Sequence, residues 1–306
     1  MGYSAYRNLP YSISSTPKNC LASSDELGFA LEDGTFRVTI NEKHVYTATH
    51  KDGRRISSLE AINDSLPSIF MMGCSYTYGM GVDDTENFSY LVQTELDNYR
   101  IQNFGVPGYG TVQSLLQLQK SIEDGDLPEI VVINFCAFHE ERNVLSPKYR
   151  QHLNIGFAGS SEHAKLEMEK GRFPYFEKGE IRYETWNGLY QNWAGRETFA
   201  TVNYLQSNAD KSVNEGLDPR GVTLTIFRKI KELCDSNGIL LLVTSLERTS
   251  EASHLLTELN SRDFTTVDIS LNLSTKKYTN LPYDSHPNAK AHEHFAEKIL
   301  NQLKVR

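Results

Sequence analysis

The chain has 306 residues, of which 39% are apolar and 23% are charged. This is the composition of a globular protein, and it excludes collagen, coiled coil and wholesale disorder. The 31 basic residues are outnumbered by 39 acidic residues, so the net charge is −8 at pH 7. An acidic chain without a basic block is not expected to bind nucleic acid.

No apolar stretch approaches the roughly 18 residues that a membrane span requires, and residues 1–7 lack the apolar core of a signal peptide. The cysteines lie far apart without a Cys-x-x-Cys pair, so the sequence predicts neither a zinc framework nor a disulfide framework. We therefore expect a soluble, cytoplasmic protein with no metal, no cofactor and no membrane partner. The cysteines are Cys20, Cys74, Cys136 and Cys234.

The first part of the chain, residues 1–65, is predicted to be an extension that carries a small β meander. Residues 1–24 are rich in Ser, Pro and Tyr, which favours an irregular lead-in. Short apolar runs on either side of Asp33-Gly34 predict a hairpin, because Asp-Gly is a strong hairpin signal. Residues 44–49 are expected to add a third strand.

From residue 66 to 306 strands alternate with helices, which predicts a parallel sheet with helices on both faces. Apolar runs predict strands at 69–72, 101–104, 130–133, 239–244 and 264–269. Apolar residues at helical spacing predict helices at 88–96, 111–122, 222–233 and 289–303. The alternation lapses at about 144–219, where a polar and aromatic insert is expected to be largely irregular, with one hairpin from 173–176 and 181–184.

The strongest chemical signal is the segment Gly73 to Gly79, which directly follows the first apolar strand. A small polar residue at that point lies at the carboxyl edge of a parallel sheet, where such sheets place their ligands. We therefore expect the Ser75 hydroxyl to point into the crevice. The alternative is a serine that only caps a turn.

The second signal is the segment Asn103 to Thr111, which leaves a strand, contains three glycines and enters a helix. Glycines permit close backbone approach and leave N–H groups free, as an oxyanion hole requires. The dinucleotide fingerprint and the Walker lysine are both missing. The alternative is a tight turn that needs glycine geometry.

The third signal is the pair Asp284 and His286, just before the last helix. A serine hydroxyl needs a base within hydrogen-bond reach, and a third group must orient that base. Ser75, His286 and Asp284 supply these roles. The alternative is a loop that starts a helix, with His286 on the surface.

These three blocks, in this order, resemble the SGNH (GDSL) hydrolases over residues 66–143 and 222–303. The resemblance implies a flavodoxin-like, three-layer α/β/α fold and ester or acyl chemistry. It also implies Ser75 as nucleophile, His286 as base, Asp284 as orienting group, and the N–H groups of Ser75 and Gly108 as oxyanion donors.

The sequence departs from the family pattern at three places. Cys74 replaces the Asp of Gly-Asp-Ser, and the terminal block is Asp-x-His rather than Asp-x-x-His. In the third block Phe138 and His139 stand where the family has Asn and Asp. His139 or Asn143 is therefore the candidate for a third oxyanion donor.

The sequence thus predicts a serine esterase that acts on a small-molecule or carbohydrate ester, with an O-acetyl group as the favoured substrate. The alternatives are an acyltransferase with the same triad, and a binding protein that kept the fold and lost the chemistry. An α/β-hydrolase is disfavoured because Thr77 breaks the Gly-x-Ser-x-Gly pattern. Candidate substrate-binding aromatics are Tyr76, Tyr109, Trp186 and Trp193, although the small core of a lid is the favoured place for either insert tryptophan taken singly.

Overall fold

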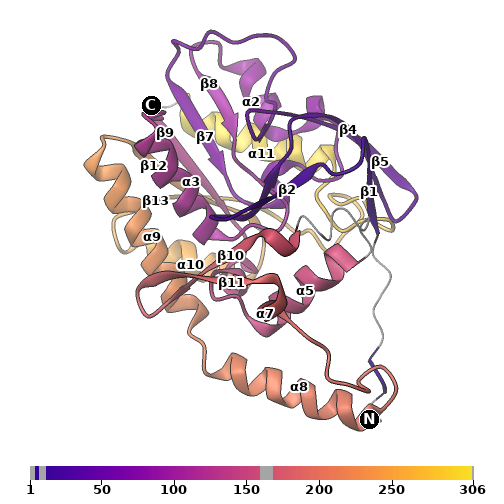
Figure 1. Ribbon diagram of the computed structural model, residues 1–306. Helices are drawn as coiled ribbons and strands as arrows, with labels where there is room; N and C mark the ends of the chain where they lie inside the picture. The colour runs from indigo at the N-terminus through magenta and orange to yellow at the C-terminus, as the bar shows by residue number, and fades with distance from the viewer. Residues whose placement is uncertain (1–3, 7–11, 159–167, 305–306) are drawn as a thin grey trace.

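The computed structural model describes residues 4–6, 12–158 and 168–304 (Figure 1). Within this part of the chain, the main sheet has nine strands, of which five are parallel. These five stand in the order β8-β7-β9-β12-β13, so the second strand along the chain is at one side of the first and the other three follow on the opposite side. This is the flavodoxin-like order, and it confirms the predicted fold class. The five are β7 (Ser68–Met72), β8 (Arg100–Asn103), β9 (Ile130–Phe135), β12 (Leu240–Glu247) and β13 (Thr265–Leu271).

Helices cover both faces of the parallel strands (Figure 1). Successive side chains of a strand point to opposite faces, so Ile69 and Met71 of β7 pack on one side while Phe70 and Met72 pack on the other. Because both faces are covered, the strand is apolar almost throughout. The first face carries α2 (Phe88–Glu95) and α11 (Ala289–Leu303), and the second carries α3 (Thr111–Glu123), α9 (Pro219–Ser236) and α10 (Ser250–Asn260).

Four strands from the start of the chain extend the same sheet in antiparallel fashion beyond β8. The junction is the pairing of Arg55 with Asn103. The turn between the two longest of these strands contains Asn41 and Glu42, both with positive φ, as a tight hairpin turn requires. The strands are β1 (Ile13–Thr16), β4 (Gly34–Ile40), β5 (His44–Lys51) and β6 (Arg54–Arg55).

The prediction of a hairpin around Asp33-Gly34 is wrong. β3 (Gly28–Leu31) pairs with β2 (Leu21–Ser24) in a separate two-stranded sheet, whereas β4 pairs with β5. The Asp33 carboxylate accepts the N–H groups of Asp52 and Gly53, so it fixes the neighbouring turn while the chain crosses from one sheet to the other. The expectation of an irregular lead-in over residues 1–24 is also wrong for β1 and β2.

The insert contains the predicted hairpin, formed by β10 (Arg172–Glu177) and β11 (Glu180–Thr185). It is more regular than expected, because it also contains α5 (Pro147–Ala158), α7 (Trp186–Leu189) and α8 (Ala200–Glu215). Figure 1 shows α8 apart from the main sheet, beside the N-terminal end of the chain. The side-chain amide of Asn203, on α8, donates to the Ser4 carbonyl, and the Arg196 carbonyl, just before α8, accepts the Tyr6 N–H.

A third apolar cluster packs the N-terminal strands against the insert and the glycine-rich segment. It includes Phe29, Tyr78, Tyr109, Tyr149 and Phe173. Among the described residues, we find no helix that combines the length and the apolar character needed to cross a bilayer.

Candidate active site

The structure brings Ser75, His286 and Asp284 together at the carboxyl ends of the parallel strands. The Ser75 Oγ lies 3.0 Å from Nε2 of His286, and Nδ1 of that ring lies 2.8 and 3.0 Å from the two carboxylate oxygens of Asp284. With its proton on Nδ1, His286 donates to Asp284 and its Nε2 accepts the Ser75 hydroxyl. The arrangement is a continuous hydrogen-bonded chain between residues that are 211 positions apart.

Burial and charge act in opposite directions on Asp284. The residue is only 4% exposed, and burial alone would raise the pKa of its carboxyl. The hydrogen bond and the charge of His286 outweigh burial, so the pKa of Asp284 lies below its ordinary value. The carboxylate is therefore ionised at neutral pH and able to stabilise a protonated imidazole.

The backbone around Ser75 holds the nucleophile at the start of the short helix α1 (Ser75–Tyr78). A Cβ at Gly73 would lie 2.3 Å from Thr77 Oγ1 and 2.9 Å from the Asn134 carbonyl oxygen, so only glycine fits. The helix ends at Gly79, whose φ is 84°. The N–H groups of Gly79 and Met80 both return to the Ser75 carbonyl, at 3.0 and 2.9 Å. These two hydrogen bonds thus close the turn that carries the Ser75 hydroxyl.

Arg55 of the N-terminal strands clamps the end of this turn. Its guanidinium is 1% exposed and donates to the carbonyls of Tyr78 at 3.0 Å and of Gly79 at 2.5 Å. It also donates to the carbonyls of Thr47 and Val82 and pairs with the Asp84 carboxylate at 2.8 Å. No local sequence pattern predicts the role of Arg55, because that role depends on contacts with segments remote from its own strand.

The loop that carries the base is fixed by Asn280. Its N–H donates to the His286 carbonyl at 3.1 Å, its carbonyl accepts the N–H of Asp284 at 3.2 Å, and its amide donates to the Gly81 carbonyl at 3.2 Å. Asn288 caps α11, as expected if this segment only starts a helix. The imidazole of His286 is nevertheless turned towards Ser75 rather than into solvent.

Two backbone N–H groups are available as oxyanion donors. Within the described part of the chain, nothing accepts the N–H of Ser75 or of Gly108. Gly108 has a φ of 93°, and a Cβ there would lie 2.9 Å from the Phe29 ring. The Tyr149 hydroxyl donates to the Gly108 carbonyl at 2.5 Å, and Arg142 donates to the next carbonyl, that of Tyr109, at 2.7 Å. Tyr149 and Arg142, neither of which the sequence singled out, therefore hold the Gly108 peptide in place.

Neither candidate for the third donor is hydrogen-bonded to the triad. Asn143 ends α4 (His139–Asn143), and its amide is engaged elsewhere, accepting the Val112 N–H and donating to Thr223 Oγ1. His139 is 1% exposed and faces the sulfur atoms of two cysteines.

Of the four aromatic candidates, only Tyr76 touches the triad, with its ring edge-on to His286 at 5.5 Å between centroids. Tyr109 is fully buried and donates its hydroxyl to the Phe29 carbonyl, so it belongs to the core rather than to a pocket. Trp186 packs against Phe173 of the third apolar cluster, and Trp193 is 48% exposed on the insert. The structure does not bring these three to the hydroxyl of Ser75.

A hollow of about 360 Å³ lies next to Tyr76 and Gly108. Phe138 in its wall packs edge-on against Tyr76 at 5.5 Å, and Tyr149 contacts Gly108. Two of the charged side chains in its wall pair with each other, Lys148 with Glu141 at 3.1 Å. A third, the Arg142 guanidinium, lies 4.2 Å from the centre of the Phe138 ring. The hollow is lined by Phe138, Glu141, Arg142, Lys148, Tyr149, Gln151 and His152.

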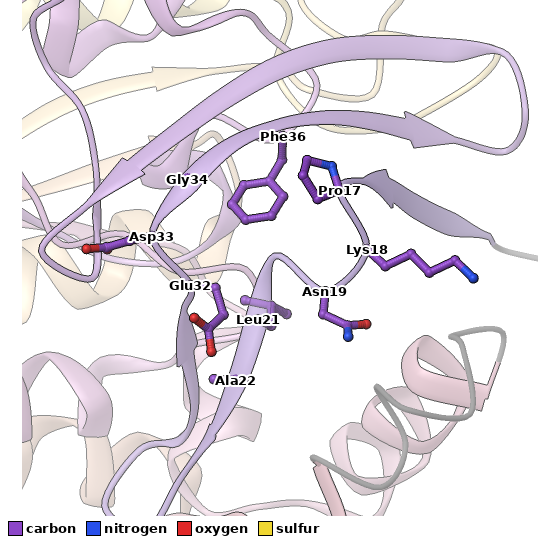
Figure 2. A pocket seen from close by; sticks show the side chains of 9 residues that line it. All are labelled: Pro17, Lys18, Asn19, Leu21, Ala22, Glu32, Asp33, Gly34 and Phe36. Atoms are coloured by element: carbon purple, nitrogen blue, oxygen red, sulfur yellow. The ribbon is translucent and has the colours of Figure 1, made fainter.

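A second hollow, of about 380 Å³, lies among the N-terminal strands (Figure 2). Its wall comes from residues 17–22 and 32–36 and contains no member of the triad. No member of the triad lines the first hollow either, but its wall residues Phe138 and Tyr149 contact Tyr76 and Gly108, so we place the substrate there.

No family model matches the sequence, and no curated protein matches it. Among the solved structures similar to the chain, TesA is 12% identical, with a TM-score of 0.43 over 78% of this chain and 98% of its own. A variant of Axe2, an acetyl xylan esterase from Geobacillus stearothermophilus, is 10% identical, with a TM-score of 0.39 over 79% and 96%. A lipolytic protein of the G-D-S-L family from Veillonella parvula DSM 2008 is 12% identical, with a TM-score of 0.42 over 78% and 98%. The G-D-S-L family is the one that the three sequence blocks resemble.

Proposed function

We propose that the chain is a serine hydrolase of SGNH type that cleaves a carboxylic ester. The observation that carries the proposal is the hydrogen-bonded chain from the Ser75 hydroxyl through His286 to Asp284. An imidazole that is hydrogen-bonded to a serine hydroxyl through Nε2 and to a carboxylate through Nδ1 activates the serine for attack on an acyl carbon.

The reaction follows from these positions. Ser75 Oγ attacks the acyl carbon while Nε2 of His286 takes its proton, and the Asp284 carboxylate stabilises the imidazolium. The N–H groups of Ser75 and Gly108 bind the oxyanion that develops. The ester C–O bond then breaks, and Nε2 returns the proton to the leaving alcohol. Water, deprotonated by the same nitrogen, releases the acid from the acyl-enzyme and regenerates the Ser75 hydroxyl.

In the hollow next to Tyr76 and Gly108 we place a small acyl group on a polar alcohol, with an O-acetylated carbohydrate as the favoured substrate. Its volume suits a compact ligand rather than a long acyl chain. Its wall combines the rings of Phe138 and Tyr149 with charged groups, which suits a sugar that offers both apolar and hydroxyl faces. A sugar hydroxyl in place of water would make the same machinery an acyltransferase.

The test is labelling by a fluorophosphonate probe, with p-nitrophenyl acetate hydrolysis measured alongside. Wild type and Ser236→Ala, a control at the exposed end of α9, are expected to be labelled. Ser75→Ala and His286→Ala are expected to lose labelling and about 10⁴- to 10⁶-fold in kcat. A folded wild type that is neither labelled nor active would overturn the proposal.

A specific observation supports the second candidate, a binding protein without catalysis. Phe138 packs on Tyr76 where the family supplies an amide donor, and losing one oxyanion donor costs about 10² to 10³ in rate. The unlabelled wild type of the preceding test would favour this candidate. Acetylated oligosaccharides that raise the Tm of Ser75→Ala would then identify its ligand class.

A further inference from the structure

Cys74, Cys136 and His139 form a buried cluster directly behind the nucleophile. Their side chains offer two sulfur atoms and one imidazole nitrogen, and these ligand atoms all lie within 4.8 Å of one another. Both cysteines are fully buried and His139 is 1% exposed. Two segments contribute: Cys74 precedes α1, and the stretch from the end of β9 to the start of α4 carries both Cys136 and His139.

The imidazole of His139 is short of partners. Neither of its ring nitrogens has a hydrogen-bond partner of ordinary geometry among the described residues, although the Cys74 side chain is close enough to interact with the ring. A buried donor or acceptor without a partner costs about 1 to 3 kcal/mol. The rings of Phe135 and Phe138 lie edge-on to the imidazole at 5.5 and 5.2 Å between centroids, so packing holds it in this orientation. The ring therefore faces the two sulfur atoms.

A metal ion would bind all three groups at once, each through one ligand atom. Two thiolates and an imidazole suit zinc, whereas magnesium and calcium require oxygen ligands. With Zn–S bonds of about 2.3 Å and a Zn–N bond of about 2.0 Å, ligand atoms around a tetrahedral ion lie about 3.5 to 3.8 Å apart. The present separations, all within 4.8 Å, need to shorten by at most about 1.3 Å to reach that geometry.

We propose that Cys74, Cys136 and His139 bind a zinc ion through two thiolates and one imidazole. Binding releases two protons, one from each thiol, and the two thiolates neutralise the charge of Zn²⁺, so no net charge is buried. The ion would join the ends of β7 and β9 to the start of α4 behind Ser75. Its role would be to position the nucleophile's turn, because it lies on the core side of Cys74 and takes no part in the ester reaction.

The primary test is cobalt, used as a spectroscopic probe of the wild-type full chain in the presence of a reducing agent that does not bind metals. Thiolate ligands give an intense sulfur-to-cobalt charge-transfer band in the near ultraviolet, and a tetrahedral site gives strong visible bands. Both are expected with one equivalent of Co²⁺ and are expected to disappear when Zn²⁺ is added. Cobalt binding without the thiolate band would overturn the proposal, and so would the lack of any binding.

Variants locate the site. After reconstitution with Zn²⁺ and dialysis, wild type is expected to retain one zinc ion per chain. Cys136→Ala and His139→Leu are expected to lose it. Cys234→Ala, a buried cysteine on α9, is the matched control and is expected to retain zinc. Zinc should also raise the Tm of wild type and of the control only. Equal zinc in wild type and Cys136→Ala would overturn the assignment, whatever the outcome of the esterase test.

Discussion

Asp284 stands two residues before His286, one fewer than in the pattern that the terminal block resembles. The carboxylate nevertheless reaches Nδ1 with both oxygens, at 2.8 and 3.0 Å. The spacing works because the Asp284 N–H is bonded to the Asn280 carbonyl, which turns the loop back towards the ring. The orienting role of Asp284 thus depends on the path of this loop rather than on the number of residues.

Asp284→Asn tests that role. An amide NH₂ facing Nδ1 would favour the tautomer with its proton on Nε2, which cannot accept the Ser75 proton. We expect kcat for a small ester to fall by about 10⁴, with little change in KM. Asp25→Asn, at an exposed turn, serves as the control. A loss of less than tenfold in Asp284→Asn would show that this carboxylate does not orient the base.

Tyr149 is predicted to act as a positioning residue for the Gly108 peptide. Tyr149→Phe removes the hydroxyl that donates to the Gly108 carbonyl at 2.5 Å and leaves the ring in place. We expect kcat/KM for a small ester to fall about tenfold and the free energy of unfolding to fall by about 1 kcal/mol. Steady-state kinetics of this variant beside Tyr90→Phe on α2 provides the measurement. Equal kinetics in the two variants would remove Tyr149 from the site.

At this scale the sequence predicts the residues that the structure brings together, Ser75, Asp284 and His286, better than those that hold them in place. Ser75 and His286 each follow a recognisable local pattern, a strand end or a helix start. Tyr109 was misjudged as pocket-lining because its burial depends on Phe29, about 80 residues away. Arg142 and Tyr149 gave no signal for the same reason: their partners are backbone carbonyls of another segment.

At the scale of elements, the N-terminal strands and the turn of α1 form one structural unit through Arg55. Arg55→Met keeps the length of the side chain but leaves the Asp84 carboxylate buried without its partner, and removes the donor to the Tyr78 and Gly79 carbonyls. We expect a loss of about 3 to 5 kcal/mol in the free energy of unfolding. Urea denaturation measures it.

Arg37→Met is the control for this change, because Arg37 is exposed on β4 of the same group of strands. We expect the free energy of unfolding of this variant to lie within about 0.5 kcal/mol of that of wild type. Two variants of equal stability would show that Arg55 does not join the strands to the turn.

The elements that sequence reasoning predicted well are those with a strong physical pattern. The parallel strands are buried on both faces, so their apolar runs are continuous, and α3, α9 and α11 each bury an apolar stripe. α8 was missed because Tyr204, Leu205 and Val213 are exposed on it and its buried residue is the polar Gln206. The Asp33-Gly34 hairpin failed because strand pairing depends on distant partners, which a turn dipeptide does not specify.

At the scale of the whole molecule, two buried histidines are expected to make the free energy of unfolding depend on pH. Burial lowers the pKa of His50 to about 4 and that of His292 to about 3. His50 contacts the Glu32 carbonyl and the Tyr78 hydroxyl, both at 2.8 Å, and His292 accepts the Phe88 N–H. Both rings are therefore neutral in the folded chain at pH values where they would be protonated in the unfolded chain.

Above pH 6.5 these rings contribute no pH dependence, because they are neutral in both states. Below that pH the unfolded chain binds protons that the folded chain does not, so the free energy of unfolding falls as pH is lowered. The fall amounts to about 3 kcal/mol for His50 between pH 6.5 and about 4. Denaturation at a series of pH values should show a shallower slope in His50→Gln, by up to about 1.4 kcal/mol per pH unit. Parallel curves for the variant and wild type would contradict the prediction.

The distance along the chain between Ser75 and His286 has a consequence for protein synthesis. Ser75 is synthesised 211 residues before His286. Until the loop at 280–287 has been made and has packed against Gly81, the hydroxyl has neither the imidazole nor the carboxylate beside it. Under the proposed function, a nascent chain that ends before this loop is therefore inactive towards esters.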